Sequence, residues 1–195
     1  MLLDELREKA MVCRRCDLAN GRTHVVFGSG NPKADVMFVG EAPGYHEDRE
    51  GEPFVGAAGQ LLSRLLESIG LSRADVYIAN VLKCRPPENR DPTTLEVETC
   101  KPYLLRQIEI ISPRIVGALG NFATRVLTGR RTGVTKLRGE PIQIGNFFVL
   151  PMLHPAAALH RGSFQSSVEE DFQFLKNLLA ADLEPEPRPE QIDLF

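Results

Sequence analysis

Four short apolar segments recur along the chain, and residues that interrupt regular structure stand at their ends. Their successive side chains are apolar on both faces, which is typical of strands buried on two sides in a parallel sheet. Glycine, proline, aspartate or asparagine bounds each segment. We therefore predict strands at residues 35–40 (DVMFVG), 76–81 (VYIANV), 114–120 (RIVGALG) and 147–152 (FFVLPM).

Longer amphipathic segments separate these apolar runs. Residues 58–70 carry leucines on one helical stripe and end in Gly70, a residue typical of helix C-caps. Helices are also expected at 101–112, where Pro102 suits a first turn, and at 121–127. Strand–helix alternation of this kind predicts a three-layer αβα sandwich around a central, mostly parallel four-stranded sheet. A last helix is indicated by Val168, Phe172, Leu175, Leu178 and Leu179.

Length and composition favour a single domain. The chain has 195 residues, of which 43% are apolar, enough to fill one compact core. We expect the domain over residues 1–182, because the proline-rich segment 183–195 is typical of a flexible linker and tail. The N-terminal segment has no apolar stretch typical of a signal peptide, and no apolar run reaches membrane-spanning length. We expect a cytoplasmic protein.

The four cysteines are Cys13, Cys16, Cys84 and Cys100, and the first two form a C-x-x-C pair within VCRRCD. Such a pair can be a disulfide, half of a metal site or a redox couple. In a cytoplasmic protein structural disulfides are rare. The set of four therefore favours metal ligands over two disulfide bridges.

The formal net charge of −3 is unevenly distributed. Residues 183–195 hold four acidic residues against one arginine, so the preceding body of the chain is neutral. Within that body, residues 125–140 hold five basic residues against Glu140 alone. A local basic patch of this kind can contact a phosphate backbone. On charge alone, a solvated loop is the favoured interpretation.

Polar and aromatic residues follow the predicted strands. In an open α/β sheet, ligands bind beyond the carboxyl ends of the strands. Glu41 stands there in the tight turn GEAPGYHED, and Phe54 follows in the loop EPFVG, outside the apolar pattern. Asn80 ends the second strand, and His154 ends the fourth before a proline. Each residue alone suits a turn, a cap or a structural role, but their convergence on one edge favours a binding site.

These motifs resemble one enzyme family when they are taken together. The segments GEAPG, EPFVG, ANVLKCRPPENR and HPAAA, with four spaced cysteines, are similar to the family 4 uracil-DNA glycosylases, which carry a [4Fe–4S] cluster. The resemblance runs from Cys13 to about Leu179. It implies the uracil-DNA glycosylase fold and the removal of uracil from single- or double-stranded DNA in base excision repair.

The resemblance implies two catalytic residues. Glu41 would place the attacking water, and His154 would donate a hydrogen bond to O2 of the departing uracil. Gly40, Glu41 and Ala42 would line the uracil pocket. In the related family 1 enzymes an aspartate places the water, at the position matching Ala42 here. The resemblance therefore implies that Glu41 takes over this function.

Three further residues would select the base. Phe54 is expected to stack on the flipped nucleotide, and Asn80 to read its hydrogen-bonding edge. An amide held in one orientation matches the donor and acceptor of uracil and opposes the reversed pattern of cytosine. By the same resemblance, Glu47 takes the place of the tyrosine that bars the methyl group of thymine.

The resemblance also assigns the cysteines and the basic loop. Cys13, Cys16, Cys84 and Cys100 would ligate a structural [4Fe–4S] cluster, with a four-cysteine zinc site as the chemical alternative. Arg130, Arg131, Lys136 and Arg138 would contact DNA phosphates near the flipped nucleotide. A related subfamily that bonds covalently to DNA carries a histidine in this loop, and no histidine occurs between residues 128 and 139 here.

The main functional hypothesis is thus a monofunctional, monomeric glycosylase without lyase activity, because no lysine stands in a pocket motif. The alternative is a non-catalytic iron–sulfur module that binds DNA alongside the replication machinery. The final residues, QIDLF, resemble peptides that bind sliding clamps. Gln191, Leu194 and Phe195 would be their anchors, presented on a flexible linker.

Overall fold

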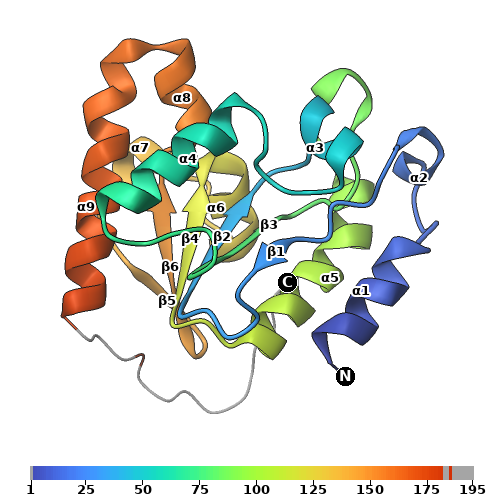
Figure 1. The fold of residues 1–195 in the computed structure, drawn as a ribbon, viewed down its shortest axis with the longest axis horizontal. Coiled ribbons are helices and arrows are strands. Elements are labelled where there is room, and N and C mark those ends of the chain that lie inside the picture. The colour runs from blue at the N-terminus through green and yellow to red at the C-terminus, as the bar shows by residue number, and fades with distance from the viewer. Residues whose placement is uncertain (1, 182–184, 186–195) are drawn as a thin grey trace.

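A six-stranded sheet lies between two layers of helices in the computed structural model, which describes residues 2–181 and residue 185 (Figure 1). The predicted clamp-binding residues, Gln191, Leu194 and Phe195, lie outside the described residues, and so does most of the predicted linker. No helix in the described part of the chain is long and apolar enough to cross a membrane.

The sheet has the strand order β1-β3-β2-β4-β6-β5. Its four central strands are parallel to one another, which confirms the predicted four-stranded core. Two short edge strands, β1 and β5, pair antiparallel with their neighbours and were not predicted. The strands are β1 (Ser29–Gly30), β2 (Val36–Gly40), β3 (Tyr77–Asn80), β4 (Ile115–Leu119), β5 (Ile142–Ile144) and β6 (Phe147–Met152).

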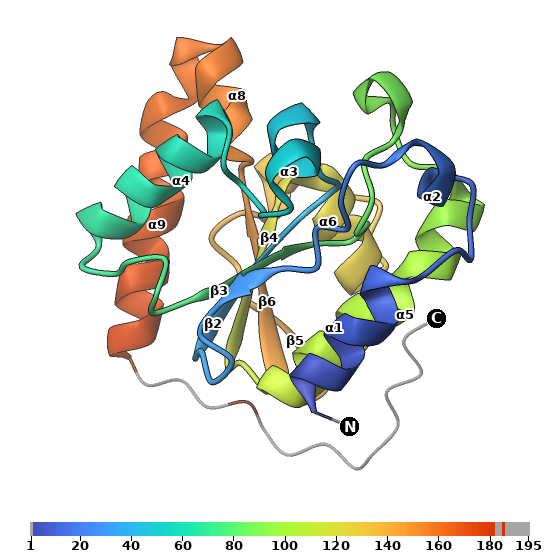
Figure 2. The ribbon, with the colours of Figure 1, turned by 45° about the vertical axis from the view of Figure 1, so that its right-hand side comes forward.

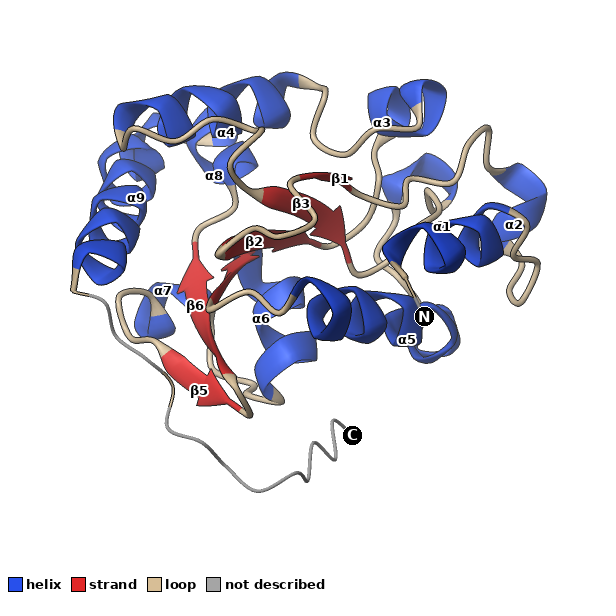
Figure 3. Cartoon of the chain, turned by 60° about the horizontal axis from the view of Figure 1, so that its bottom comes forward, coloured by secondary structure: helices blue, strands red, loops and turns tan. Residues whose placement is uncertain are grey.

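Helices cover both faces of this sheet (Figures 2 and 3). One face packs against α1 (Leu3–Met11), α5 (Thr94–Ile111) and α6 (Gly120–Thr128). The other packs against α4 (Ala57–Ser68), α8 (Pro155–His160) and α9 (Gln165–Ala180). The predicted three-layer αβα sandwich is therefore confirmed. Short helices complete the chain: α2 (Leu18–Gly21), α3 (Tyr45–Glu50) and α7 (Val134–Leu137), with 3₁₀ turns η1 (Pro87–Asn89) and η2 (Gly162–Phe164).

The apolar strands divide their side chains between two cores. In β2, Met37 and Val39 pack with the α1–α5–α6 layer, whereas Val36 and Phe38 pack with the α4–α8–α9 layer. The alternation arises because successive side chains of a strand point to opposite faces. Burial on both sides explains why these strands are apolar throughout.

The helix α5 begins earlier than the sequence pattern indicated. We expected a helix over 101–112 with Pro102 in its first turn, but α5 starts at Thr94 and Pro102 lies inside it. A capping box sets this start, because the Thr93 hydroxyl accepts from the Glu96 amide and the Glu96 carboxylate accepts from the Thr93 amide. Cys100 consequently lies in the second turn of α5 and not before the helix.

Two other helices agree with their predicted stripes. Gly70 has a φ of +83°, and the Leu71 amide donates to the Leu66 carbonyl, a bond typical of a glycine-terminated helix. In α9, Phe172 is fully buried and stacks on Phe38, with ring centroids 5.7 Å apart and planes 13° apart. This aromatic pair joins α9 to the centre of the sheet.

Replacing Phe172 with alanine should therefore destabilise the fold severely. Loss of a buried aromatic ring leaves a cavity and costs about 3–5 kcal/mol in the free energy of unfolding. Urea unfolding followed by circular dichroism would measure this loss. Gln173→Ala is the matched control on the exposed side of α9 and should change stability by less than about 0.5 kcal/mol. Equal stability of the two variants would contradict the assigned packing.

Candidate active site

A cavity of about 530 Å³ opens at the carboxyl edge of the parallel strands. Its size lies within the range of small-molecule sites, about 300–1,000 Å³. The predicted residues Glu41, Ala42, Glu47, Phe54, Asn80 and His154 all line it. The structure thus brings together residues from four segments that are far apart in the sequence. The other lining residues are Pro43, Gly44, Ala58, Pro86, Asn89, Arg90, Ala156 and His160.

Gly40 is not itself a lining residue, but its lack of a side chain leaves space for two residues that are. It is the register partner of Asn80 where β2 and β3 end. A Cβ atom at Gly40 would lie 2.4 Å from Asn80 Oδ1 and 2.7 Å from Phe54 Cζ. Glycine is therefore required here for packing, because any side chain would displace the amide and the ring. Gly40 was predicted to line the pocket, and its role is to admit two residues that do.

Phe54 has an unusual backbone conformation, with a φ of +55°. Bulky residues rarely adopt this left-handed region. We expected its ring to lie outside the core, but the residue is only 7% exposed and packs with the α4–α8–α9 layer. Its ring stacks on that of His154, with centroids 5.6 Å apart and planes 26° apart. One aromatic side chain thus contributes to both core and cavity.

His154 is the N-cap residue of α8, and its side chain accepts a hydrogen bond from the helix backbone. The Ala156 amide donates to His154 Nδ1 at 3.1 Å, so Nδ1 is the acceptor nitrogen of the ring. A neutral imidazole that accepts at Nδ1 carries its proton at Nε2. Burial lowers the pKa of His154 to about 4, although the nearby Glu47 carboxylate opposes the shift. The ring is therefore a neutral hydrogen-bond donor near pH 7.

The carboxylate of Glu47 joins two loops of the cavity. Its Oε2 accepts from the Gly44 amide at 3.1 Å, and its Oε1 accepts from the Val55 and Gly56 amides at 3.0 and 2.9 Å. Both oxygens therefore fix backbone in place. The sequence predicted only a steric role for Glu47, and this bridging role was missed because its partners are backbone groups.

Glu41 is half-buried and lines the same cavity. Burial raises the pKa of its carboxyl group, and Asp91 raises it further, while Arg125 lowers it. The segment that follows β3 fixes the backbone of Glu41, whose carbonyl accepts from the Leu82 amide at 3.0 Å. A carboxylate so placed can orient a polar molecule in the cavity.

The segment PPENR adds a wall that the sequence analysis did not identify. Asn89 and Arg90 line the cavity. Arg90 is held by two hydrogen bonds to the Glu96 carboxylate, at 2.6 and 2.9 Å. Glu96 also caps α5, so one carboxylate both holds Arg90 at the cavity and stabilises the start of the helix. The proline-rich turn was the available signal, but it does not specify which side chain faces the cavity.

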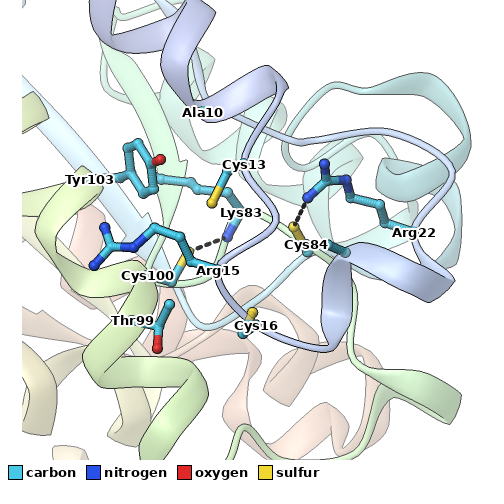
Figure 4. Close-up of a pocket in the computed structure, with 11 residues that line it drawn as sticks. Ala10, Cys13, Arg15, Cys16, Arg22, Lys83, Cys84, Thr99, Cys100 and Tyr103 are labelled. Atoms are coloured by element: carbon cyan, nitrogen blue, oxygen red, sulfur yellow. Dashed lines mark hydrogen bonds between the residues drawn. The ribbon is translucent and has the colours of Figure 1, made fainter.

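All four cysteines line a second pocket beside the first. Figure 4 shows their sulfur atoms around one shared space, with Cys13 and Cys16 from the α1–α2 connection. None forms a disulfide, and Cys84 and Cys100 are buried. Among the described residues, no three His, Cys, Asp or Glu side chains converge closely enough to hold a single metal ion. All four thiols nevertheless line the same pocket, so the donor set available there consists of four cysteine sulfurs.

Positive charge surrounds the thiols. Arg15, Arg22 and Lys83 line the same pocket. Arg22 donates to Cys84 Sγ at 3.3 Å, and the Lys83 amide donates to Cys100 Sγ at 3.2 Å. Burial raises the pKa of the Cys100 thiol to about 11, an effect that bound metal would reverse by stabilising the thiolate. The donor set and its cations fit an anionic metal–thiolate group.

Lys83 connects the cysteine pocket to the cavity. It is only 2% exposed. Its Nζ donates to the Asn80 carbonyl at 2.8 Å and to Gln107 Oε1 at 2.6 Å. Gln107 in turn donates to the Phe27 carbonyl at 2.9 Å. The chain from Asn80 to Cys84 is therefore fixed as one unit.

Comparison with known proteins places this arrangement in a family. Residues 27–179 match the model of the uracil DNA glycosylase superfamily. The chain belongs to the uracil DNA glycosylase superfamily. The type-4 uracil-DNA glycosylase of Archaeoglobus fulgidus is 47% identical over 184 residues, covering 90% of this chain and 92% of that protein.

Two other type-4 uracil-DNA glycosylases are similar to this chain along most of its length. The Sulfurisphaera tokodaii protein is 43% identical over 202 residues, covering 99% of this chain and 90% of its own length. The Thermotoga maritima protein is 44% identical over 182 residues, covering 91% of this chain and 95% of its own length. The family resemblance inferred from the motifs is therefore confirmed.

The basic residues around α7 differ in their surroundings: some are exposed to solvent, and one forms ion pairs within the protein. Arg130, Arg131 and Lys136 are exposed around α7. Arg138 is partly buried, and its guanidinium donates to the Asp171 carboxylate at 2.8 Å and to Glu170 at 2.9 Å. These ion pairs anchor its loop on α9. A phosphate contact by Arg138 stays a prediction.

The lowered pKa of His154 predicts a dependence of stability on pH. An unfolded histidine titrates near 6.5, so between about pH 6.5 and pH 4 the unfolded chain binds a proton that the folded chain excludes. The stabilisation from this group is complete above pH 6.5 and is lost as pH falls toward 4. Between pH 7 and pH 5 the loss should be about 2 kcal/mol.

Urea unfolding at both pH values would measure this loss against His154→Asn, which retains a capping side chain. The variant should lose about 2 kcal/mol less than the native protein on acidification, since all other groups titrate in both. An identical pH dependence of the two proteins would show that His154 is not held in its neutral form.

Proposed function

We propose that the chain is a monofunctional uracil-DNA glycosylase that hydrolyses the N-glycosidic bond of uracil in DNA, in base excision repair. Its strongest support is one observation: a neutral histidine donor, an amide and an aromatic face share one cavity at the strand ends. The names of the similar type-4 proteins support the same activity. The lack of a Schiff-base lyase step stays a prediction from the sequence.

His154 would stabilise the leaving base. Cleavage of the C–N bond places negative charge on uracil, and a glycosylase reaches that bond by flipping the nucleotide out of the stack. The Nε2–H group of a neutral imidazole would donate to O2 of uracil and bind more strongly as the charge grows. Because α8 fixes Nδ1 as an acceptor, this donor is oriented before DNA arrives.

Asn80 and Phe54 would select the base. Asn80 is 2% exposed, and its Oδ1 packs closely on Gly40, where a Cβ atom would lie 2.4 Å away. A confined amide offers one donor and one acceptor in a single orientation, which matches uracil and opposes cytosine. The face of Phe54 would stack on the base. Exclusion of the thymine methyl group by Glu47 stays a prediction, supported by the rigid placement of that residue on the cavity wall.

Glu41 would act on the sugar side of the bond. Loss of the base leaves positive character on the sugar, as in glycoside hydrolysis, and a carboxylate can both offset that charge and orient water. Burial and Asp91 raise the pKa of Glu41 from its ordinary value of 4.5, whereas Arg125 opposes the shift. The carboxylate form is the one that this role requires.

Exposed basic residues would hold the DNA backbone. Arg130, Arg131 and Lys136 are exposed and close together in sequence. Contacts of this kind position a duplex without reading its sequence. A phosphate contact by Arg138, whose guanidinium also binds carboxylates of α9, stays a prediction. Binding of the QIDLF tail to a sliding clamp and a monomeric state remain predictions from sequence.

We further propose that Cys13, Cys16, Cys84 and Cys100 hold a [4Fe–4S] cluster. The support is that the four thiols line one volume together with three cationic side chains. Thiolates are the usual ligands of such clusters, and hydrogen bonds to sulfur tune them. The cluster would link the α1–α2 connection to the loop that follows β3 and to α5. We expect this role to be structural, because base hydrolysis transfers no electrons.

The activity is tested by incubating the purified protein with a uracil-containing oligonucleotide and measuring free uracil. Native protein should release uracil, and His154→Ala should lower the single-turnover rate by about 10²–10³, the usual effect of losing an oxyanion-type donor. His46→Ala, which changes an exposed histidine outside the cavity, should leave the rate unchanged. DNA binding without any base release by native protein would favour the alternative, a non-catalytic DNA-binding module.

The cluster is tested by metal analysis of protein purified without oxygen. The native protein should be brown and contain roughly four iron atoms per chain. Cys16→Ser should lose most of the iron and lower the melting temperature, because the α1–α2 connection would no longer be linked to α5. One zinc ion per chain with no iron would contradict the cluster and favour the zinc alternative.

A further inference from the structure

The backbone of Phe54 lies in a conformation that its side chain disfavours. A φ of +55° is strained for a bulky residue, and such strain persists only where the surroundings over-determine it. Strained residues of this kind concentrate at functional sites. The surroundings of Phe54 therefore show what the protein does to keep the ring in place.

Arg73 holds the carbonyl side of this segment. It lies in the turn between α4 and β3. Its guanidinium donates to the Phe54 carbonyl at 3.0 Å and to the Pro53 carbonyl at 2.7 Å. The two donors of a planar fork thus bind two consecutive peptide groups, which fixes their orientation as one donor could not. Burial lowers the pKa of this guanidinium, and Glu52 opposes the shift.

Glu47 holds the amide side of the same segment. Its carboxylate accepts from Val55 and Gly56, the two amides that follow the Phe54 carbonyl. A cation therefore binds the carbonyls of residues 53 and 54 while an anion binds the amides of residues 55 and 56. Together they fix the peptide groups on both sides of the strained residue.

Gly59 is the third residue that restrains the Phe54 segment. A Cβ atom there would lie 1.7 Å from the Phe54 carbonyl oxygen, so the first turn of α4 packs directly on this peptide group. The carbonyl is confined between Gly59 and the Arg73 guanidinium. With its peptide groups fixed, the Phe54 ring is directed toward His154.

We propose that Arg73 is a positioning residue for base recognition, which holds Phe54 in its left-handed conformation and thereby presents the ring face to the flipped base. The inference rests on the proposed function, in which Phe54 stacks on uracil. Arg73 lines a second depression, which Phe54 also lines, and it is not among the residues that line the cavity proposed to bind the base. It therefore acts through Phe54 and does not touch the base.

Loss of Arg73 should weaken base binding more than it slows the chemical step. Without the two donors, the Phe54 backbone can relax toward negative φ, and the ring leaves its stacking position. A misplacement of about 1 Å costs up to about 100-fold in catalytic efficiency. Because stacking stabilises ground state and transition state alike, the loss should appear mainly as a raised KM.

The test compares Arg73→Met, Arg73→Lys and the control Arg64→Met, an exposed arginine of α4, in steady-state uracil release. Arg73→Met should lower kcat/KM roughly 10- to 100-fold, mainly through KM, and weaken inhibition by free uracil by a similar factor. Arg73→Lys should lie between, since it keeps the charge but loses the fork. Arg64→Met should match native protein.

A double-mutant cycle with Phe54→Ala separates positioning from general damage. If Arg73 acts through Phe54, adding Arg73→Met to Phe54→Ala should cause little further loss, whereas independent effects would multiply. Full native kcat/KM in Arg73→Met, or multiplicative losses in the double variant, would overturn the inference. Absence of uracil release by native protein would instead overturn the proposed function. Melting temperatures identify a variant that fails to fold, in which case Arg73→Lys carries the cycle.

Discussion

The parallel register of the four central strands is the constraint on which the site depends. Gly40 pairs with Asn80 where β2 and β3 end, and Leu119 pairs with Met152 at the ends of β4 and β6. Helices on both faces bury these strands, so a shift of register by one residue would exchange the two cores and is excluded. The loops that follow must therefore begin at one edge. Their side chains meet there although they are far apart in the sequence, as Glu41 and His154 are.

Buried polar groups then hold the loops at this edge. Asp171 accepts from the Leu153 amide at 2.7 Å and from Arg138 at 2.8 Å, which fixes the chain just before His154. Lys83 likewise fixes the end of β3, because its Nζ donates to the Asn80 carbonyl. Within the described residues, no fully buried side-chain nitrogen or oxygen lacks a hydrogen-bond partner. Loss of one partner in such a network leaves a desolvated group, so these contacts maintain the cavity geometry as strictly as the apolar core does.

Much of the fold was predictable because it follows from periodicity, whereas the site was predictable only as a set of residue types. The edge strand β1 has two residues, too few for any alternation to appear. The start of α5 depends on a capping box that we did not identify, so Pro102 was misplaced. Glu41, Phe54, Asn80 and His154 were found from strand-end position and motif. The contacts of Arg73 could not be found this way, since they are made to distant backbone carbonyls that have no sequence signature.

Burial moves the two proposed catalytic groups toward their neutral forms, and this has different consequences for each. It lowers the pKa of His154 to about 4 and raises that of Glu41. Bound DNA brings phosphate charges that favour protonation of both groups. His154 begins about three pH units below neutrality, so it stays a neutral donor even when phosphates approach. Burial and Asp91 raise the pKa of Glu41, and the nearby Arg125 opposes this shift. The geometry of the cavity thus protects the donor by burial and the carboxylate by a cation.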